Sequence, residues 1–420
     1  MHEFHYDNNI LVAEQIGLHD AARTFGTPLF VYSKHSLLDH CRNIERAFEG
    51  RRHTTYYAVK ANANRSLLRL IAEEGLGADV GSGGELHLAL HAGFQPEKIT
   101  FSGVGKRDDE ISLGLSHGVH AFNVESSEEL EIISTIAARE GKRARILLRV
   151  NLDIDAGGHA YVSTSKRQNK FGVPWQQAAE FLRWAVSLPN IVIGGIHSHI
   201  GSQIVREETF LKAAESLRSL VAELRASGLS IEDLDFGGGF GVQYRGYLQH
   251  PQLPQEEPEA INLSAATLVR AVLPVLESTG CRISIQPGRS VVAHSGALLV
   301  RVVFRKETDE KVFVVVDGGM NDLIRPALYH AHHQIVPVRL DGRPYEIVDV
   351  VGPLCESGDF LALDRALPRV MRGDLLAVMG AGAYGFVLSS NYNARLRPAE
   401  VLIDGSSMNI IREREVYDDL

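Results

Sequence analysis

Short apolar runs rich in branched residues alternate with longer segments of helical periodicity from Lys34 onward. Apolar runs of this kind, bounded by turn residues, are typical of buried parallel strands. The segments with this pattern are His53–Val59, Gly77–Val80, Lys98–Ser102, Ala121–Val124, Arg145–Val150, Ile191–His199, Leu234–Phe236 and Arg282–Ile285. The alternation of strands and helices predicts an α/β fold with a parallel sheet.

The segments between these strands carry apolar residues on one helical face. In the stretch 206–228 the apolar positions fall three or four residues apart, at Phe210, Ala213, Leu217, Leu220, Val221 and Leu224. This spacing places them on one side of an α-helix. Ser126, with Glu129 three positions later, predicts a capping box at the start of another helix.

A (β/α)8 barrel is the predicted arrangement of residues 33–288, because each of the strands is followed or preceded by a helix. The alternation alone leaves an open doubly wound sheet as the alternative. In a barrel the functional residues lie where the strands end. Polar residues do stand at these ends, namely Lys60, Asp79, Ser102, Arg149, Asn151, His199 and Gln286. This coincidence favours the barrel.

The pattern changes after Arg289, where strands follow one another with turn residues and little helix between them. These segments are ALLVRVVFRKE, KVFVVVDGG, YEIVDVVG, GDLLAVMG and AEVLIDG. They predict an all-β domain, a sandwich or a barrel. The opening stretch FHYDNNILVAEQ has the pattern of a strand pair around Asn8 and Asn9. We assign it to the same domain, which then comprises residues 1–32 and 289–420.

Composition excludes several classes of function. The net charge of −9 argues against a nucleic-acid partner, which requires a basic face. There is no apolar run of about 18 residues, so no membrane span is expected. The opening residues MHEFHYDNNI lack the basic and apolar regions of a signal peptide. The three cysteines leave an odd thiol without the spacing of a metal site, which fits a reducing cytoplasm.

The stretch TTYYAVKANAN runs a predicted strand into Lys60 and surrounds this lysine with small residues and asparagines. A surface lysine in an ion pair needs no such setting. A lysine at the mouth of a barrel can instead bond covalently to a carbonyl compound, because partial burial lowers the pKa of an amine. Pyridoxal phosphate would further require a phosphate cradle, a partner for the pyridine nitrogen and a group against the ring.

Two motifs have the character of such a site. DFGGGFG, residues 235–241, places three glycines at a strand end, where the backbone can approach an anion closely. The motif is not GxGxxG and no helix pattern follows it, so a dinucleotide is not indicated. In HSHIGSQI, His197 and His199 share one face of a strand, but no third ligand at a suitable spacing indicates a metal. We expect His199 to lie on a cofactor ring and Ser202 to face its phosphate.

The motifs AVKAN, HSHIGSQ, DFGGGFG, QPGRS, GGMNDLIRPALY, CESGD and GAYGF resemble those of the fold-type III pyridoxal-phosphate decarboxylases, and among these the diaminopimelate decarboxylases. The resemblance extends from about Gly26 to the C-terminus. It implies a barrel with a β domain, a head-to-tail homodimer with shared active sites, and pyridoxal 5′-phosphate as cofactor. It also implies that meso-2,6-diaminopimelate is decarboxylated to L-lysine and carbon dioxide, the last step of lysine biosynthesis.

The resemblance further implies a role for each matching residue. Lys60 holds the cofactor covalently, and Cys355 donates a proton to the substrate carbon. The implied cofactor-binding residues are Lys60, Asp79, His199, Ser202, Gly238, Gly239, Gln286, Gly288, Arg289 and Tyr384. The implied substrate-binding residues are Arg289, Arg325, Tyr329, Glu356 and Tyr384. Cys355 and Glu356 are expected to enter the site from the partner subunit.

Gln286 departs from the resembled motif, in which Glu-Pro-Gly-Arg is usual. The glutamate pairs with a protonated pyridine nitrogen, whereas a glutamine is neutral and can either accept from a protonated nitrogen or donate to a bare one. The departure leaves open a related decarboxylase that acts on another amino acid or on a carrier-linked or siderophore precursor. A cofactor-binding protein without catalysis is a further alternative, against which the retained Cys355 and Tyr384 argue.

Overall fold

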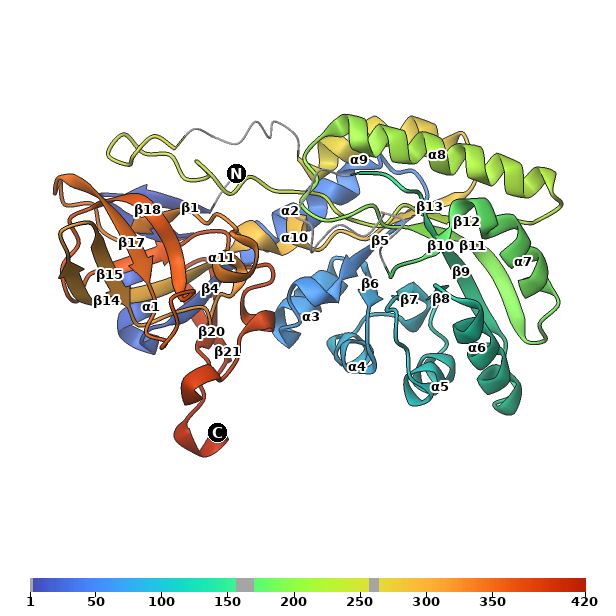
Figure 1. Cartoon of the computed structure of the whole chain (residues 1–420), viewed down its shortest axis with the longest axis horizontal. Helices are drawn as coiled ribbons and strands as arrows, with labels where there is room; N and C mark the ends of the chain where they lie inside the picture. Colours follow the sequence, from blue (N-terminus) through green and yellow to red (C-terminus); the bar gives the residue numbers. More distant parts are fainter. Residues whose placement is uncertain (1–2, 156–169, 257–263) are drawn as a thin grey trace. The chain divides into compact units, whose positions relative to one another are not determined.

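The computed structural model describes residues 3–155, 170–256 and 264–420 (Figure 1). The chain divides into two compact units. One unit, the barrel unit, comprises 41–242 and the described part of 262–290. The other, the β unit, comprises the described parts of 1–40 and 243–261, together with 291–420.

The barrel unit is built on eight parallel strands. They are β5 (His53–Ala58), β6 (Gly77–Val80), β7 (Ile99–Phe101), β8 (Ala121–Val124), β9 (Ala144–Asn151), β11 (Ile191–Ser198), β12 (Asp233–Asp235) and β13 (Arg282–Ile285). They pair in the order β9-β11-β12-β13-β5-β6-β7-β8, and β8 pairs again with β9. This last pairing closes the sheet. The predicted (β/α)8 barrel is confirmed, and the open doubly wound sheet is wrong.

Each barrel strand is followed by a helix, as the alternating pattern predicted. The helices are α3 (Arg65–Glu73), α4 (Gly83–Ala92), α5 (Asp108–His117), α6 (Ser127–Arg139), α7 (Ala178–Val186), α8 (Glu207–Ala226), α9 (Ala265–Glu277) and the short α10 (Arg289–Val292). The apolar face predicted between residues 206 and 228 is the buried face of α8. Helices α8 and α9 pack side by side along the barrel (Figure 1). A two-residue strand, β10 (Val173–Pro174), extends the sheet beside β9, and α2 (Lys34–Ala47) precedes the first barrel strand.

The start of α6 differs in one bond from the predicted capping box. Ser126 caps the helix by accepting a hydrogen bond from the Glu129 amide nitrogen. The Glu129 carboxylate does not accept the hydrogen bond from the Ser126 amide nitrogen that would complete the capping box. It accepts from the Glu125 amide nitrogen at 2.7 Å and from the Lys106 ammonium at 2.6 Å. A buried ammonium attracts a carboxylate more strongly than a neutral amide does, so Lys106 draws Glu129 away from the capping box.

The β unit consists of strands with little helix. A first sheet contains β1 (Phe4–Asp7), β2 (Ile10–Ala13) and β3 (Ile16–Gly17), and α1 (Leu18–Phe25) follows it. A second sheet contains β4 (Leu29–Ser33), β14 (Gly296–Glu307), β15 (Val312–Val316), β16 (Ile335–Pro337), β17 (Tyr345–Val351), β18 (Phe360–Pro368), β19 (Leu375–Val378), β20 (Ala399–Asp404) and β21 (Ser407–Arg412). Asn8 and Asn9 have φ angles of 47° and 65°, so they form the predicted hairpin turn between β1 and β2.

One apolar core holds the β unit together. Residues from both sheets, from α1 and from the segment around Leu248 contribute to it.

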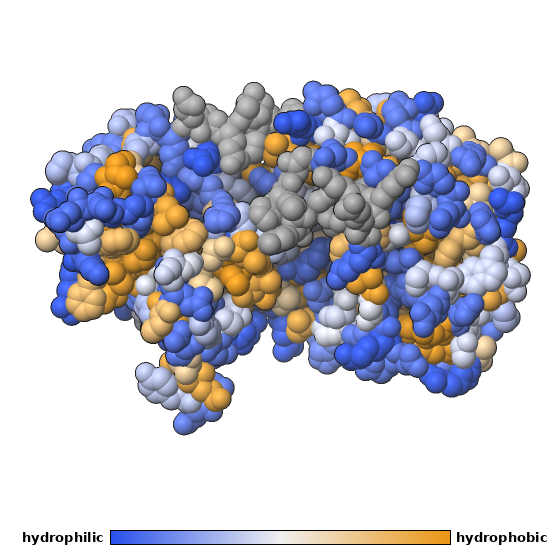
Figure 2. Space-filling view, viewed as in Figure 1, coloured by the Kyte–Doolittle hydropathy of each residue, from blue (hydrophilic) through white to orange (hydrophobic). Residues whose placement is uncertain are grey.

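Hydrophilic residues cover most of the face seen in Figure 2, and apolar residues gather there in small patches. None of the helices in the described ranges is both long enough and apolar enough to cross a membrane.

Gly195 in β11 offers a test of how tightly the barrel strands pack. A Cβ atom there would lie 1.9 Å from the Asp233 carbonyl oxygen on β12, next to a register shift of β11. We expect Gly195→Ala to destabilise the barrel unit by about 2–3 kcal/mol, because the backbone must move to admit the methyl group. At Gly105 nothing lies within 4 Å of the added atom, so Gly105→Ala should stay within about 1 kcal/mol. Urea unfolding of both variants measures the difference, and equal midpoints would contradict the close approach.

Candidate active site

Lys60 lies in a 3-10 turn, Val59–Ala61, directly after β5. Its ammonium nitrogen is 3.4 Å from Oδ2 of Asp79 on β6, and its side chain is about half exposed while that of Asp79 is buried. The asparagines after the lysine shape the turn. The Asn62 side chain accepts from the Asn64 amide nitrogen, and Asn64 caps α3. Local hydrogen bonds therefore hold the lysine at the barrel mouth beside a buried carboxylate.

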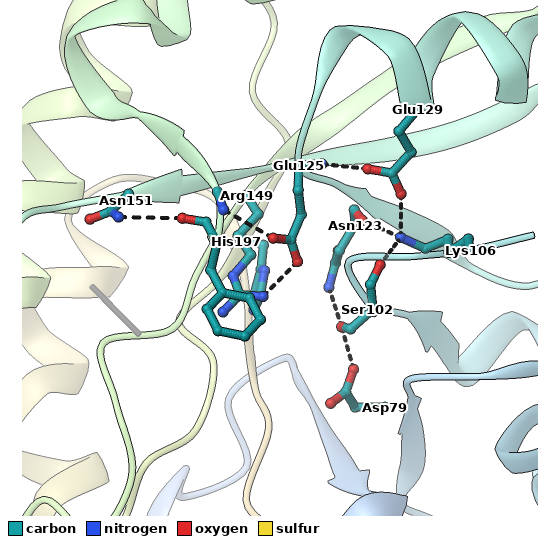
Figure 3. Close-up of polar contacts among 12 residues, drawn as sticks. Asp79, Ser102, Lys106, Asn123, Glu125, Glu129, Arg149, Asn151 and His197 are labelled. Atoms are coloured by element: carbon teal, nitrogen blue, oxygen red, sulfur yellow. Dashed lines mark hydrogen bonds and ion pairs between the residues drawn. The ribbon is translucent and has the colours of Figure 1, made fainter. Parts of the chain in front are cut away.

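A chain of hydrogen bonds runs from Asp79 to the next two strand ends (Figure 3). The Ser102 hydroxyl donates to Asp79 Oδ1 at 2.5 Å, and the Asn123 side-chain amide donates to the Ser102 oxygen at 2.9 Å. All three side chains are buried. Asp79 is thereby fixed in position on one side and faces Lys60 on the other.

Lys106 supports this chain of hydrogen bonds. Its side chain has no exposed surface, and its ammonium donates to the carbonyl oxygens of Gly103 and Asn123 and to Glu129 (Figure 3). The three acceptors lie 2.8, 2.7 and 2.6 Å away. Sequence reasoning missed both Lys106 and Asn123. Asn123 did carry a signal, because it is a polar residue inside the apolar strand AFNV.

A second buried ion pair lies between the ends of β8 and β9. Arg149 donates to Glu125 at 2.6 Å, and the other oxygen of Glu125 accepts from the Gly172 amide nitrogen at 3.0 Å. The guanidinium also lies over the ring of Phe171, 4.7 Å from its centroid. The sequence pattern placed Arg149 at a strand end but gave no indication of its carboxylate partner.

His197 and His199 lie at the end of β11 and contact different partners. His197 Nε2 is 3.1 Å from the Gln286 side-chain oxygen, and His199 Nδ1 accepts from the Gly238 amide nitrogen at 3.2 Å. Burial lowers the pKa of both imidazoles well below the usual value, and the cations of Lys60 and Arg149 add to this effect. Both rings are therefore neutral at pH 7. A neutral, partly buried His199 suits a contact with an aromatic ring.

The glycine motif forms the loop after β12. Gly237 and Gly239 have φ angles of 73° and 97°, which residues with side chains rarely adopt. Cβ atoms at Gly238 and Gly239 would lie 2.1 Å from the Gln286 carbonyl oxygen and 2.5 Å from the Gly201 carbonyl oxygen. The Gly237 and Gly238 amides donate to Asp235 and His199. Gly238 thus permits close packing and positions His199, while Gly239 is the better candidate for an anion.

Arg289 and Gly288 complete the barrel side of the site after β13. An Arg289 Nη donates to the Ser202 hydroxyl at 2.9 Å, so a buried cation lies next to the hydroxyl expected to face the phosphate. A Cβ atom at Gly288 would lie 3.0 Å from the Cβ atoms of Ala58 and Ala61. An amine, a neutral imidazole, a glycine loop and a cation thus occupy the same end of one barrel, and this set fits pyridoxal phosphate.

Arg325 and Tyr329 belong to the β unit and lie on the one-turn helix α11 (Arg325–Tyr329). The buried Arg325 guanidinium contacts His333 Nε2 at 2.6 Å and lies over the Tyr244 ring, 4.6 Å from its centroid. His333 Nδ1 is 2.8 Å from the Met379 carbonyl oxygen. A carbonyl can only accept, so Nδ1 carries the proton and Nε2 accepts from Arg325.

Cys355 and Glu356 are exposed in the loop between β17 and β18. Asp359 anchors this loop, because its two oxygens accept from the amide nitrogens of Met320 and Leu354, each at 2.6 Å. The Tyr392 hydroxyl donates to Glu356. Cys355 is thus not a buried hydrophobe, which is the usual setting of a free cysteine.

Tyr384 is half-buried in the β unit and has a φ angle of 55°. Residues other than glycine rarely take this conformation, and such strained positions concentrate at functional sites. The predicted site residues therefore form two groups within separate units. The barrel unit contains Lys60, Asp79, His199, Ser202, Gly238, Gly239, Gln286, Gly288 and Arg289, and the β unit contains Arg325, Tyr329, Cys355, Glu356 and Tyr384.

Comparison with known proteins agrees with this geometry. Residues 34–293 match the family model described as pyridoxal-dependent decarboxylase, pyridoxal binding domain. The chain belongs to this family. The family resemblance inferred from the motifs is confirmed, and pyridoxal phosphate is the cofactor.

Individual relatives carry a more specific name. The chain is 43% identical to the diaminopimelate decarboxylase of Aquifex aeolicus, over 98% of this chain and 95% of the relative. It is 44% identical to that of Pseudomonas aeruginosa, over 100% and 98%. The crystal structure of the M. jannaschii diaminopimelate decarboxylase in complex with L-lysine matches with a TM-score of 0.91 at 34% identity, over 99% of this chain and 96% of that chain.

Lys106 offers a test of the buried charges beneath the site. Replacing it by methionine leaves the Glu129 carboxylate without its ammonium, so Lys106→Met should destabilise the protein by about 3–5 kcal/mol. Adding Glu129→Gln removes the orphaned charge and keeps an oxygen for the Glu125 amide, so the double variant should recover a large part of the loss. Lys212 on α8 is exposed, and Lys212→Met is the matched control. Denaturant unfolding of all variants checks the prediction, and additive losses would contradict the ion pair.

Proposed function

We propose that this chain is a diaminopimelate decarboxylase, which converts meso-2,6-diaminopimelate to L-lysine and carbon dioxide in the last step of lysine biosynthesis. The observation that carries the proposal is the match over nearly the whole chain to several enzymes of that name, at 40–44% identity. Solved structures of diaminopimelate decarboxylases hold L-lysine, the product expected here. We further propose that the enzyme works in the cytoplasm.

The cofactor half of the site consists of barrel residues. Pyridoxal phosphate, when bound, takes up the electron pair that the departing carboxylate leaves behind. Lys60 would hold the cofactor through its aldehyde and would give up this place to the substrate amine. The neutral His199 lies against the ring. Ser202, Gly239 and Arg289 are the proposed phosphate ligands of the barrel unit, and the family resemblance assigns Tyr384 the same task.

The substrate half consists of residues that recognise the end of the molecule that does not react. The planar guanidinium of Arg325 suits a carboxylate, and its contact with His333 fixes its orientation. We also assign Tyr329 and Arg289 to the binding of this carboxylate. We propose a homodimer in which the partner's Glu356 binds the distal ammonium of the substrate. The partner's Cys355 protonates the carbon that has lost its carboxylate.

The alternative is a related decarboxylase that acts on a different amino acid. Gln286, in place of the glutamate of the resembled motif, is the observation in its favour. The solved lysine/ornithine decarboxylase of Vibrio vulnificus is 23% identical to this chain and has the same fold. Since a second carboxylate distinguishes diaminopimelate from lysine and ornithine, Arg325 favours the proposed substrate.

Covalent attachment at Lys60 is the first prediction from this function. After borohydride treatment of the protein loaded with pyridoxal phosphate, the peptide that contains Lys60 should carry the mass of the reduced cofactor. Without borohydride treatment, the loaded protein should release carbon dioxide and lysine from meso-diaminopimelate, and it should leave L-lysine and L-ornithine unchanged. Lys60→Ala should abolish labelling and turnover. Labelling of the peptide with Lys106 instead would contradict the assignment.

A proton-donor role for Cys355 gives the second prediction. Cys355→Ser should lower kcat about 100-fold, because the hydroxyl is a much weaker acid, while KM changes little. Cys281→Ser is the matched control, since this cysteine contacts Arg225 and Ile231 within the barrel unit and should not affect turnover. Steady-state kinetics with meso-diaminopimelate measures both. Full activity of the Cys355 variant would remove this residue from the mechanism.

A further inference from the structure

Hydrogen bonds link three buried side chains at the ends of β11, β12 and β13. The Gln286 side-chain oxygen is 3.1 Å from His197 Nε2, and its nitrogen donates to Asp235 Oδ2 at 2.9 Å. Their exposed fractions are 1% for His197, 0% for Asp235 and 4% for Gln286. Asp235 and His197 are direct neighbours in the strand register. The mechanism proposed above gives no task to Asp235.

Asp235 determines which way the Gln286 amide points. Above its pKa Asp235 is a carboxylate and can only accept hydrogen bonds, so the amide nitrogen then faces Asp235 and the amide oxygen faces His197. His197 then carries its proton on Nε2. In this orientation the Gln286 oxygen retains a second lone pair with which it can accept another hydrogen bond.

We propose that Asp235 is a positioning residue which, through Gln286, presents a hydrogen-bond acceptor to the pyridine nitrogen of the bound cofactor. The inference rests on the proposed function, which places Gln286 at that nitrogen. A glutamine alone can turn either end toward the ring. When it is ionised, Asp235 removes this freedom, and it places a negative charge one side chain behind the amide, where it favours a protonated ring nitrogen.

Asp235 is better accommodated when its neighbour at position 286 is a glutamine than it would be if that neighbour were a glutamate. Burial raises the pKa of Asp235 to about 8, and the neighbouring carboxylates Asp79 and Asp233 add to the rise. The Gly237 amide and the Gln286 amide oppose it. The Tyr56 phenol on β5 and the neutral His197 on β11 also lie near Asp235. A glutamate at position 286 would add another negative charge within hydrogen-bond distance, so one of the two carboxyl groups would hold a proton.

The test is the 15N chemical shift of 15N-labelled pyridoxal phosphate in the full-length holoenzyme at pH 8.5, above the pKa of Asp235. In the unmodified chain the ring nitrogen should have the shift of a protonated pyridine. In Asp235→Asn the new amide can still accept from Gly237, but it donates toward Gln286. The Gln286 amide then turns over and its nitrogen faces the ring. We expect the 15N shift to move to that of bare pyridine and kcat to fall at least about tenfold.

A second substitution distinguishes the positioning role from damage to the fold. Asp235→Asn combined with Gln286→Glu restores an acceptor at position 286, to which the introduced amide at position 235 and His197 can both donate. The protonated shift and most of the lost activity should therefore return. The control is Asp233→Asn, which removes a charge from the same strand at a residue that does not bond to Gln286. It should leave the 15N shift unchanged.

Each outcome decides the inference. An unchanged shift in Asp235→Asn with cofactor bound overturns it and leaves the proposed function intact. A shift that moves equally in Asp233→Asn also overturns it, because the effect would then be a general one of charge. Failure of the unmodified chain to bind the cofactor at Lys60 would overturn the proposed function together with this inference.

Discussion

The pairing of β8 with β9 closes the barrel, and the site depends on this closure. In a closed parallel sheet all carboxyl ends of the strands meet at one rim. Polar side chains that the sequence places at those ends are therefore buried next to one another. Several of them bond to a partner at the end of an adjacent strand, because an unpaired polar group in such a place costs about 1–3 kcal/mol.

The charges around the rim follow from this requirement. Arg149 with Glu125, and Lys106 with Glu129, are buried opposite charges in direct contact. Such pairs contribute little net stability compared with apolar residues, but the loss of one member is costly. Their effect is to fix neighbouring groups in place, as Lys106 does by binding the carbonyl oxygen of Asn123. The half-exposed Lys60 is the contrasting case, since its ammonium remains accessible to a carbonyl compound.

The sequence was sufficient to predict the architecture and the residues that end its strands. Apolar runs marked the barrel strands to within one or two residues, and Asn8 with Asn9 marked the hairpin of the β unit. The sequence could not predict which side chains bond to one another. Lys106 lies in a loop of ordinary composition, and only the folded barrel brings Glu129 and Asn123 to it. Hydrogen bonds between distant strands depend on which strands become neighbours in the closed sheet, and the residue pattern of a single segment does not specify its neighbours.

The role of Gln286 is interpreted differently from the sequence and from the structure. From the sequence it is a neutral substitute for a carboxylate, and the expected consequence is a loss of charge near the ring nitrogen. In the structure its amide nitrogen donates to Asp235, so a carboxyl group lies directly behind the amide, at the end of the neighbouring strand. Two carboxylates in contact would share a proton, whereas a carboxylate and an amide need not. The character of position 286 is thus tied to the residue that ends the neighbouring strand.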